Sequence, residues 1–151
     1  MNYLSVNTPL GSPVTLFEED GALVALDWGR APGGTSSPVL DQAKTQIEAF
    51  FDGGRRDFDL PLAPAGTAFQ KRVWDYLRTI PRGTVQTYGD VARAVNSAAR
   101  AVGGACAANP LPIIIPCHRV LGTNGRMTGY SGLEGVETKV LLLRLEGFLI
   151  D

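Results

Sequence analysis

Two prolines near the middle of this 151-residue chain separate halves of different character. Pro61 and Pro64 lie within Leu60–Pro64, and each restricts the residue before it to an extended conformation. A helix is not expected to run through such a segment, because proline lacks the amide hydrogen that helices need. We therefore expect an α+β protein in which an extended linker joins a first lobe, residues 1–66, to a second lobe, residues 67–151.

The first lobe is predicted to hold strands followed by one helix. Apolar residues flank Glu19–Gly21 on both sides, a pattern typical of a β-hairpin with glycine in its turn. Apolar residues then recur at helical spacing from Leu40 to Phe51, and Asp52–Gly54 stops the pattern. No set of residues in this lobe promises chemistry, so we expect it to be a scaffold.

The two lobes differ in charge, although the whole chain has a formal net charge of −1. Residues 1–66 contain four basic and nine acidic side chains, whereas residues 67–151 contain ten basic and six acidic ones. Taken as a total, this charge argues against a nucleic-acid binder, because such proteins usually present a basic surface. The basic excess of the second lobe still suits a protein that meets phosphates with one face, through few contacts and with a shallow salt dependence.

The second lobe is expected to be mostly helical. Thr67 and Thr87 are suitable N-caps for two helices. Asn96 then breaks the second of them, and Ser97 is expected to cap a third helix that runs from Ala98 to about Ala108. Two short helices joined by so tight a break resemble a helix-turn-helix of the winged-helix kind, in which the second helix contacts DNA.

That third helix consists almost entirely of small residues, and Arg100 is its only charged side chain. Gly103 and Gly104 lie in its interior, where a glycine costs roughly 1 kcal/mol relative to alanine. Two explanations are open at this point. Another helix packs closely against the glycines, or a nucleic-acid backbone approaches them, with Arg100 and the helix N-terminus attracting phosphate.

The most informative stretch runs from Ile113 to Val120. Three consecutive isoleucines predict a buried strand that ends at Pro116. Cys117 follows directly, and after it comes His118, the only histidine of the chain. An imidazole in this position is able to take the thiol proton, directly or through one water, and so create a nucleophilic thiolate. A buried, inert cysteine beside a structural histidine is the alternative reading.

Three further observations bear on this chemistry. Cys106 lies on the small-residue helix, where we expect it to have no titratable neighbour and to be inert. One histidine and two cysteines are too few ligands for a zinc centre, and we expect neither a metal nor another cofactor. Glu146 follows the last apolar helical pattern, where it either orients His118 or is a solvated charge at the helix end.

The chain shows neither a basic and apolar signal peptide nor an apolar run of roughly 18 residues. Two cysteines cannot form a disulfide framework. We therefore expect a cytoplasmic protein with free thiols and no membrane partner.

Several motifs taken together resemble the O6-alkylguanine DNA alkyltransferases, also called methylated-DNA–protein-cysteine methyltransferases. Pro116–Val120, with the sequence PCHRV, is similar to the active-site signature of that family. The resemblance covers essentially the whole chain, more loosely in the first lobe. The other matching segments are Thr67–Trp74, Ile80–Gly83, Thr87–Gly89, Ala99–Ala105, Asn109–Pro110, Gly129–Gly132 and Leu145–Gly147.

The resemblance implies an enzyme that repairs DNA by reversing the damage directly. Cys117 would take the alkyl group from O6 of guanine, and in the same way from O4 of thymine. His118 would take the thiol proton through a water, Glu146 would orient His118, and Tyr88 would donate a proton toward the guanine ring. Because a thioether is not a leaving group at neutral pH, the protein would act once and be consumed.

The resemblance also implies that the partner is double-stranded DNA, bound through its minor groove with the damaged base flipped out. Arg100 would fill the space that the base leaves, and Asn109 would be the hinge between the recognition helix and the active site. The first lobe would be ribonuclease-H-like and the protein a monomer. Other DNA contacts would come from Thr87, Tyr88, Ala99, Ala101 and Gly103, and the substrate pocket from Pro112, Val120, Tyr130, Ser131 and Gly132, with the backbone of Cys117 and Val120 reading the exocyclic amine.

Two other classes of protein remain as alternatives. Related non-enzymatic proteins recognise alkylated DNA but have tryptophan in place of the cysteine, so Cys117 speaks against that class. A thiol hydrolase normally has its cysteine and histidine far apart in the sequence, whereas His118 is the direct neighbour of Cys117 here.

Overall fold

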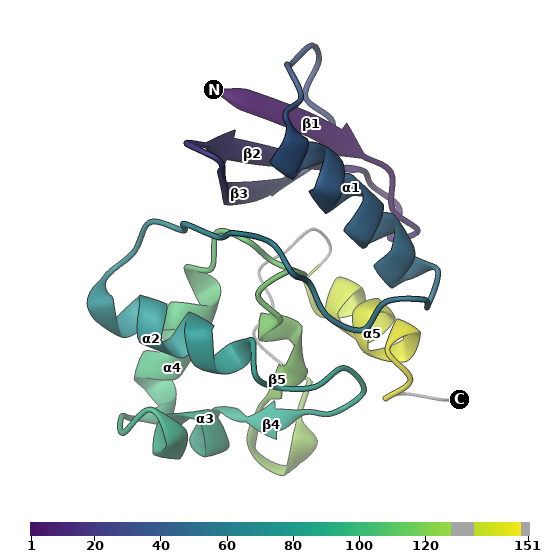
Figure 1. Cartoon of the computed structure of the whole chain (residues 1–151). Helices are drawn as coiled ribbons and strands as arrows, with labels where there is room; N and C mark the ends of the chain where they lie inside the picture. Colours follow the sequence, from purple (N-terminus) through teal and green to yellow (C-terminus); the bar gives the residue numbers. More distant parts are fainter. Residues whose placement is uncertain (128–134, 149–151) are drawn as a thin grey trace. The chain divides into compact units, whose positions relative to one another are not determined.

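The computed structural model describes residues 1–127 and 135–148, and the chain divides into two compact units, Met1–Ala65 and Gly66–Asp151. The predicted α+β class is confirmed, because the first unit holds a sheet and one helix and the second is mostly helical (Figure 1). Within the described residues, no helix has both the length and the apolar character that crossing a bilayer requires.

A three-stranded antiparallel sheet in the order β1-β2-β3 forms the base of the first unit. β1 covers Asn2–Val6, β2 covers Val14–Glu19 and β3 covers Ala22–Trp28. Asp20 and Gly21 make the two-residue turn between β2 and β3 with φ values of 53° and 83°. Both values are in the left-handed region that such tight turns require, so the predicted hairpin is confirmed.

The helix α1, Pro38–Phe51, packs against all three strands of this sheet (Figure 1). Ser37 caps its first turn by accepting a hydrogen bond from the amide of Leu40. The apolar residues predicted to recur at helical spacing include Leu40, Ala43, Ile47 and Phe50, all of which are fully buried. The unit therefore owes its core to the pattern visible in the sequence.

The proline segment is extended, as predicted, and its backbone pairs with the outer side of β3. The amide of Leu23 donates to the carbonyl of Pro61 at 2.9 Å, and the amide of Ala63 donates to the carbonyl of Leu23 at 2.8 Å. Leu62 and Leu23 thus form an isolated parallel bridge. The segment covers part of a sheet edge that would otherwise expose its backbone groups.

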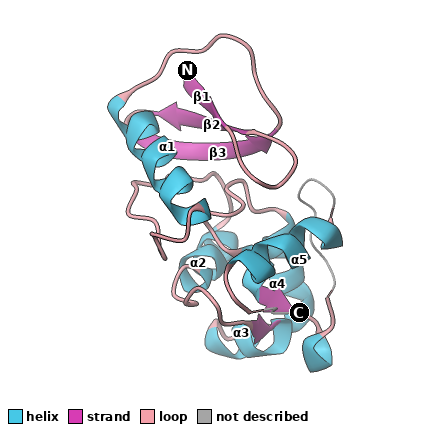
Figure 2. Cartoon of the chain, turned by 90° about the vertical axis from the view of Figure 1, so that its right-hand side faces the viewer, coloured by secondary structure: helices cyan, strands magenta, loops and turns pink. Residues whose placement is uncertain are grey.

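In the second unit, helices surround a short ladder of two parallel strands (Figure 2). Residues far apart in the sequence meet in the ladder, where Gln86 pairs with Val120 and Thr87 pairs with Leu121. The elements are α2 (Ala68–Leu77), β4 (Gln86–Thr87), α3 (Tyr88–Ala94), α4 (Ala99–Ala107), the 3-10 helix η1 (Cys117–Arg119), β5 (Val120–Leu121), the 3-10 helix η2 (Thr123–Gly125) and α5 (Val136–Leu145).

The N-caps predicted at Thr67 and Thr87 are confirmed, and each forms a capping box with the residue three positions later. The cap predicted at Ser97 is wrong, because α4 begins at Ala99 with Ala98 before it and has no side-chain cap. The backbone of Ser97 closes the preceding helix instead, its amide donating to the carbonyl of Ala92 at 2.8 Å. Asn96 adopts the left-handed conformation, φ 56°, that lets α3 end in this way.

The strand predicted at Ile113–Ile115 is also wrong, although the predicted burial is right. These residues form a turn in which the amide of Ile115 donates to the carbonyl of Leu111 at 2.9 Å and Ile113 has a φ of 75°. The prolines at 110, 112 and 116 remove three of the amide donors that a strand ladder would use, which disfavours a strand. Burial of all three isoleucines holds the turn inside the unit.

Candidate active site

Asn109 holds the turn that precedes the candidate nucleophile. Its side-chain oxygen accepts from the amide of Leu111 at 2.9 Å, and its side-chain nitrogen donates to the carbonyl of Ile115, also at 2.9 Å. The same nitrogen lies 3.3 Å from Sγ of Cys117. One amide group therefore ties both ends of the turn together and donates to the thiol sulfur.

Cys117 opens η1 and is almost completely buried, with 7% of its surface exposed. Burial raises the pKa of its thiol, while the Asn109 hydrogen bond and the charge of Lys139 oppose that rise. Deprotonation of the thiol at neutral pH therefore needs a base close by.

His118 and Glu146 form a pair with no exposed side-chain surface, and His118 Nε2 lies 2.8 Å from Glu146 Oε2. Between the open readings of Glu146, the structure favours the one in which it orients the imidazole. The carboxylate facing Nε2 selects the tautomer with the proton on Nε2, which leaves Nδ1 as an acceptor. Nδ1 is buried and has no hydrogen-bonding partner among the described residues. Burial lowers the pKa of His118, so the ring is a neutral base near pH 7.

Arg119 is a part of this site that the sequence analysis gave no role. Its guanidinium donates to both oxygens of Glu146, from Nε at 3.0 Å to Oε1 and from Nη2 at 2.7 Å to Oε2. Nη1 also donates to the carbonyl of Ile80 at 2.6 Å. Burial alone raises the pKa of Glu146, but the hydrogen bonds and charges of His118 and Arg119 outweigh it and bring the pKa to about 2. The carboxylate is therefore ionised at any physiological pH.

Lys139 is a second charged residue near the candidate site to which the sequence analysis gave no role. It is fully buried on α5, and its Nζ donates to the carbonyl of Val120 at 2.6 Å. Its position in the sequence could have indicated the burial. Lys139 precedes Leu142 by three residues and Leu143 by four, which places all three side chains on the same, apolar face of the helix. The ammonium lies 5.8 Å from the ring centroid of Tyr88.

Cys106 is not isolated, and the expectation of a thiol without titratable neighbours is wrong. Burial raises its pKa to about 12, and the charge states of Cys117 and Lys139 also act on it. The fold brings Cys106 within electrostatic range of Cys117 and Lys139, although both are distant from it in the sequence. The high pKa still makes Cys106 a poor nucleophile at neutral pH.

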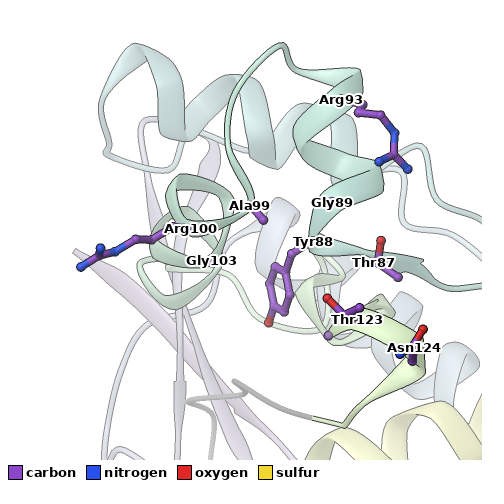
Figure 3. Close-up of a pocket in the computed structure, with 10 residues that line it drawn as sticks. Thr87, Tyr88, Gly89, Arg93, Ala99, Arg100, Gly103, Thr123 and Asn124 are labelled. Carbon is purple, nitrogen blue, oxygen red and sulfur yellow. The ribbon is translucent and has the colours of Figure 1, made fainter.

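An open groove of about 600 Å³ crosses α3, α4 and η2 (Figure 3). Tyr88 projects into its centre, whereas Arg100 extends from α4 away from Tyr88. Of the predicted DNA contacts, Ala101 is not part of the lining. The lining comprises the predicted Thr87, Tyr88, Ala99, Arg100 and Gly103 together with Gly89, Arg93, Gly122, Thr123 and Asn124, which the sequence analysis did not single out.

The glycines of α4 do not face a packed helix. A side-chain carbon added at Gly103 or Gly104 would meet no described atom within 4 Å. Helix packing is therefore not the reason for glycine at these positions. Open space in front of the helix is what the approach of another molecule would need.

The predicted substrate-pocket residues fall into three groups. Val120 is fully buried, with its carbonyl bonded to Lys139. Pro112 is half-buried in the turn before Cys117 and does not line the groove. Tyr130, Ser131 and Gly132 lie outside the described residues. In the part of the chain that the structure describes, no three His, Cys, Asp or Glu side chains gather as a metal ion would require.

Family models match both units of the chain. Residues 1–64 match the ribonuclease-like domain of 6-O-methylguanine DNA methyltransferase, and residues 68–148 match the DNA-binding domain of the same protein.

Individual proteins agree with these models over nearly full length. The methylated-DNA–protein-cysteine methyltransferase of Methanosarcina acetivorans is 50% identical, covering 97% of this chain and 99% of its own. The constitutive enzyme of Bacillus subtilis is 42% identical, covering 95% of this chain and 94% of its own. The crystal structure of Mycobacterium tuberculosis OGT in complex with DNA has a TM-score of 0.84 at 41% identity, covering 97% of this chain and 92% of that one.

Proposed function

Because the chain belongs to the O6-methylguanine DNA methyltransferase family, we propose that it repairs DNA by moving the alkyl group of O6-alkylguanine, and of O4-alkylthymine, onto Cys117. The observation that carries the assignment of the acceptor is the array Asn109–Cys117–His118–Glu146. It sets one of the chain's two thiols beside a neutral base whose orientation is held by a buried carboxylate.

The reaction begins with the transfer of the thiol proton through a water to Nδ1 of His118. Sγ of Cys117 then attacks the alkyl carbon, so that the S–C bond forms while the C–O6 bond breaks and its electron pair passes to the guanine. Tyr88 donates a proton to the guanine ring as O6 leaves. Burial raises the pKa of Tyr88 to about 12, so the phenol is protonated and able to donate near neutral pH. His118 then releases its proton to water and the phenolate of Tyr88 takes one up, so both groups return to their neutral forms and the proton that guanine gains balances the one that the thiol loses.

Nothing in this sequence of steps regenerates the thiol, because a thioether is not displaced by water at neutral pH. The protein therefore acts once per molecule. The mechanism uses no metal and no cofactor, and we expect a monomer that acts in the cytoplasm.

The DNA is bound by α3 and α4, which we interpret as a helix-turn-helix with α4 in the minor groove. The open space in front of Gly103 and Gly104 supports a close approach of the sugar-phosphate backbone to α4. Flipping a base out of the duplex costs a few kcal/mol, and insertion of Arg100 into the vacated stack offsets part of that cost. Arg100 is exposed on α4, and its side chain extends away from Tyr88 (Figure 3).

Few cations remain for phosphate contacts. Of the ten basic side chains in residues 67–151, Arg82, Arg119 and Lys139 are buried. The affinity for DNA should therefore fall only shallowly with salt.

The test is to incubate the protein with a duplex that contains O6-methylguanine and to follow it by intact-mass and peptide analysis. We expect one methyl group per protein, on Cys117, with no further turnover. Cys117→Ser should abolish transfer while DNA binding remains, and Cys106→Ser, the matched control, should still accept one methyl group. Sustained turnover, or methyl on Cys106, would overturn the proposal. Binding of damaged DNA without any transfer would identify a damage-recognition protein instead.

A further inference from the structure

The charged residues that line the groove across α3, α4 and η2 all have the same sign. The described residues of the lining include two cations, Arg93 and Arg100, and no acidic side chain. Both arginines are exposed, and Figure 3 shows them on either side of Tyr88. The proposed function assigns Arg100 to the flipped base and gives Arg93 no role. A groove that presents only positive charge favours an anion, and a DNA strand carries one at every phosphate.

Asp90 holds the guanidinium of Arg93 at the edge of this groove. Oδ2 of Asp90 accepts from the amide of Thr87 at 3.0 Å, as part of the capping box of α3. Its other oxygen, Oδ1, accepts from Nη2 of Arg93. The start of the helix therefore fixes the carboxylate, and the carboxylate fixes the arginine. A side chain supported in this way loses less conformational freedom on binding than one that is free in solvent.

The pairing with Asp90 engages only one nitrogen of the guanidinium. Arginine has five N–H donors, and among the described residues Arg93 donates a hydrogen bond only from Nη2. Nε and Nη1 therefore remain for a ligand from outside. The side chains of Arg93 and Asp90 are 76% and 41% exposed, so solvent weakens their attraction and the pair adds little to stability. Stabilisation of the fold is thus a poor explanation for an arginine at this position.

Nη1 of Arg93 lies beside backbone that no side chain covers. A side-chain carbon added at Gly89 would lie 3.7 Å from Nη1 of Arg93 and 3.7 Å from Oγ1 of Thr87. Oγ1 accepts from the amide of Asp90 at 3.0 Å, and its own hydrogen has no acceptor among the described residues. Two donors thus flank one open point at the edge of the groove. A phosphate, with several acceptor oxygens, suits this arrangement.

We propose that Arg93, together with the hydroxyl of Thr87, binds a backbone phosphate of the DNA and so fixes the position of the duplex over Tyr88. The inference rests on the part of the proposed function that places DNA in this groove. It adds a charged contact on the side of Tyr88 opposite Arg100. A phosphate contact positions a duplex without reading its sequence. Arg93 therefore contributes equally to the binding of damaged and of intact DNA.

The experiment measures the affinity of the full-length protein for an undamaged duplex by fluorescence anisotropy, at a series of salt concentrations. The variants are Arg93→Gln, Arg93→Lys and the matched control Arg78→Gln, which removes the same charge from an exposed position after α2 that does not line the groove. We expect Arg93→Gln to weaken binding by about three- to tenfold at roughly 0.1 M salt. The slope of log affinity against log salt should become shallower by about 0.9, which corresponds to one phosphate contact. Arg93→Lys should keep most of the slope, and Arg78→Gln should keep both slope and affinity.

Wild-type slope and affinity in Arg93→Gln would overturn the inference. Equal losses in Arg93→Gln and Arg78→Gln would overturn it too, because they would show an effect of net charge alone. Neither result concerns methyl transfer, so the proposed function would stand. The wild-type protein is also incubated with the O6-methylguanine duplex. Binding of the undamaged duplex without any methyl transfer would overturn the proposed function and leave the phosphate contact of Arg93 in place.

Discussion

Arg119 and Glu146 form a bidentate ion pair in the interior of the second unit, with Nη2 of the arginine 2.7 Å from Oε2 of the glutamate. The same Oε2 faces Nε2 of His118 at 2.8 Å. One carboxylate thus serves a permanent cation and a neutral base together. The positive charge of Arg119 lowers the proton affinity of His118, while Glu146 raises it, and burial lowers it further than either. The imidazole is therefore neutral at rest, and its protonated form is short-lived.

Replacement of the carboxylate should damage both stability and catalysis. Glu146→Gln leaves the guanidinium of Arg119 buried without a counter-charge, which should lower the free energy of unfolding by about 3 to 5 kcal/mol. The double variant Arg119→Met/Glu146→Gln should recover part of this loss, because the orphaned charge is removed. Chemical denaturation measures the free energy of unfolding of both variants, and Glu137→Gln on the exposed part of α5 is the control. If the double variant lost as much stability as the two single variants, Arg119→Met and Glu146→Gln, lose in sum, the ion pair would not contribute to the stability.

The stability should depend on pH in a way that these groups determine. The pKa of Glu146 is about 2 in the folded state, against 4.5 as its ordinary value, so its stabilising effect is full above pH 4.5 and is lost as the pH falls toward 2. The pKa of His118 is lowered from 6.5, so below pH 6.5 the unfolded chain binds a proton that the folded one refuses, and stability falls there too. Urea unfolding at a series of pH values tests this. In Glu146→Gln the slope between pH 4.5 and 2 should flatten, and an unaltered slope would show that other groups cause it.

Replacement of Asn109 should be harmful even when the new side chain has nearly the same shape. In Asn109→Asp, an acceptor replaces the nitrogen that donates to the Ile115 carbonyl and to Cys117 Sγ. Unmatched acceptors cost about 1 to 3 kcal/mol, and a negative charge beside the sulfur opposes thiolate formation. We expect both a lower melting temperature and slower methyl transfer. Asn96→Asp, in the left-handed turn after α3, is the control and should change neither, because aspartate tolerates that conformation. Equal behaviour of the two variants would rule out the proposed role of Asn109.

Arg100 should matter for DNA and not for the chemistry. Arg100→Ala should slow transfer from an O6-methylguanine duplex by about tenfold or more, since the flipped-out state loses the side chain that fills the stack. Transfer from free O6-benzylguanine requires no flipping and should be nearly unchanged. Rate measurements on both substrates, with the exposed Arg78→Ala as control, decide the matter. Equal losses on both substrates would exclude Arg100 from base flipping.

Local interactions explain what the sequence predicted well. Thr67 and Thr87 bond to amides three residues away, so the start of α2 and of α3 could be predicted without knowledge of the rest of the chain. The β2–β3 hairpin likewise follows from Asp20 and Gly21, whose backbone preferences are local.

Predictions failed where a residue's partner was distant in the sequence or already engaged elsewhere. Ser97 has the right chemistry for a cap, but its amide completes the end of α3. The isoleucines at 113–115 have the right composition for a strand. The side chain of Asn109, however, bonds to both ends of the segment, and three prolines lack the amides of a strand ladder, so the segment forms a turn. Propensity gave the burial correctly and the backbone conformation wrongly, because burial depends on apolarity while conformation depends on the available hydrogen bonds.

By itself, the amino-acid sequence determined the α+β class, the starts of α2 and α3 and the adjacency of Cys117 and His118, all of which depend on neighbours within a few residues. Only the tertiary structure decided which charges surround the thiol. It brought Glu146 to His118 across 28 positions and Lys139 to Val120 across 19, and it buried the ion pair of Arg119. Those contacts form between elements that pack together only in the folded protein, where low local polarity makes each charge count for more than it would in water.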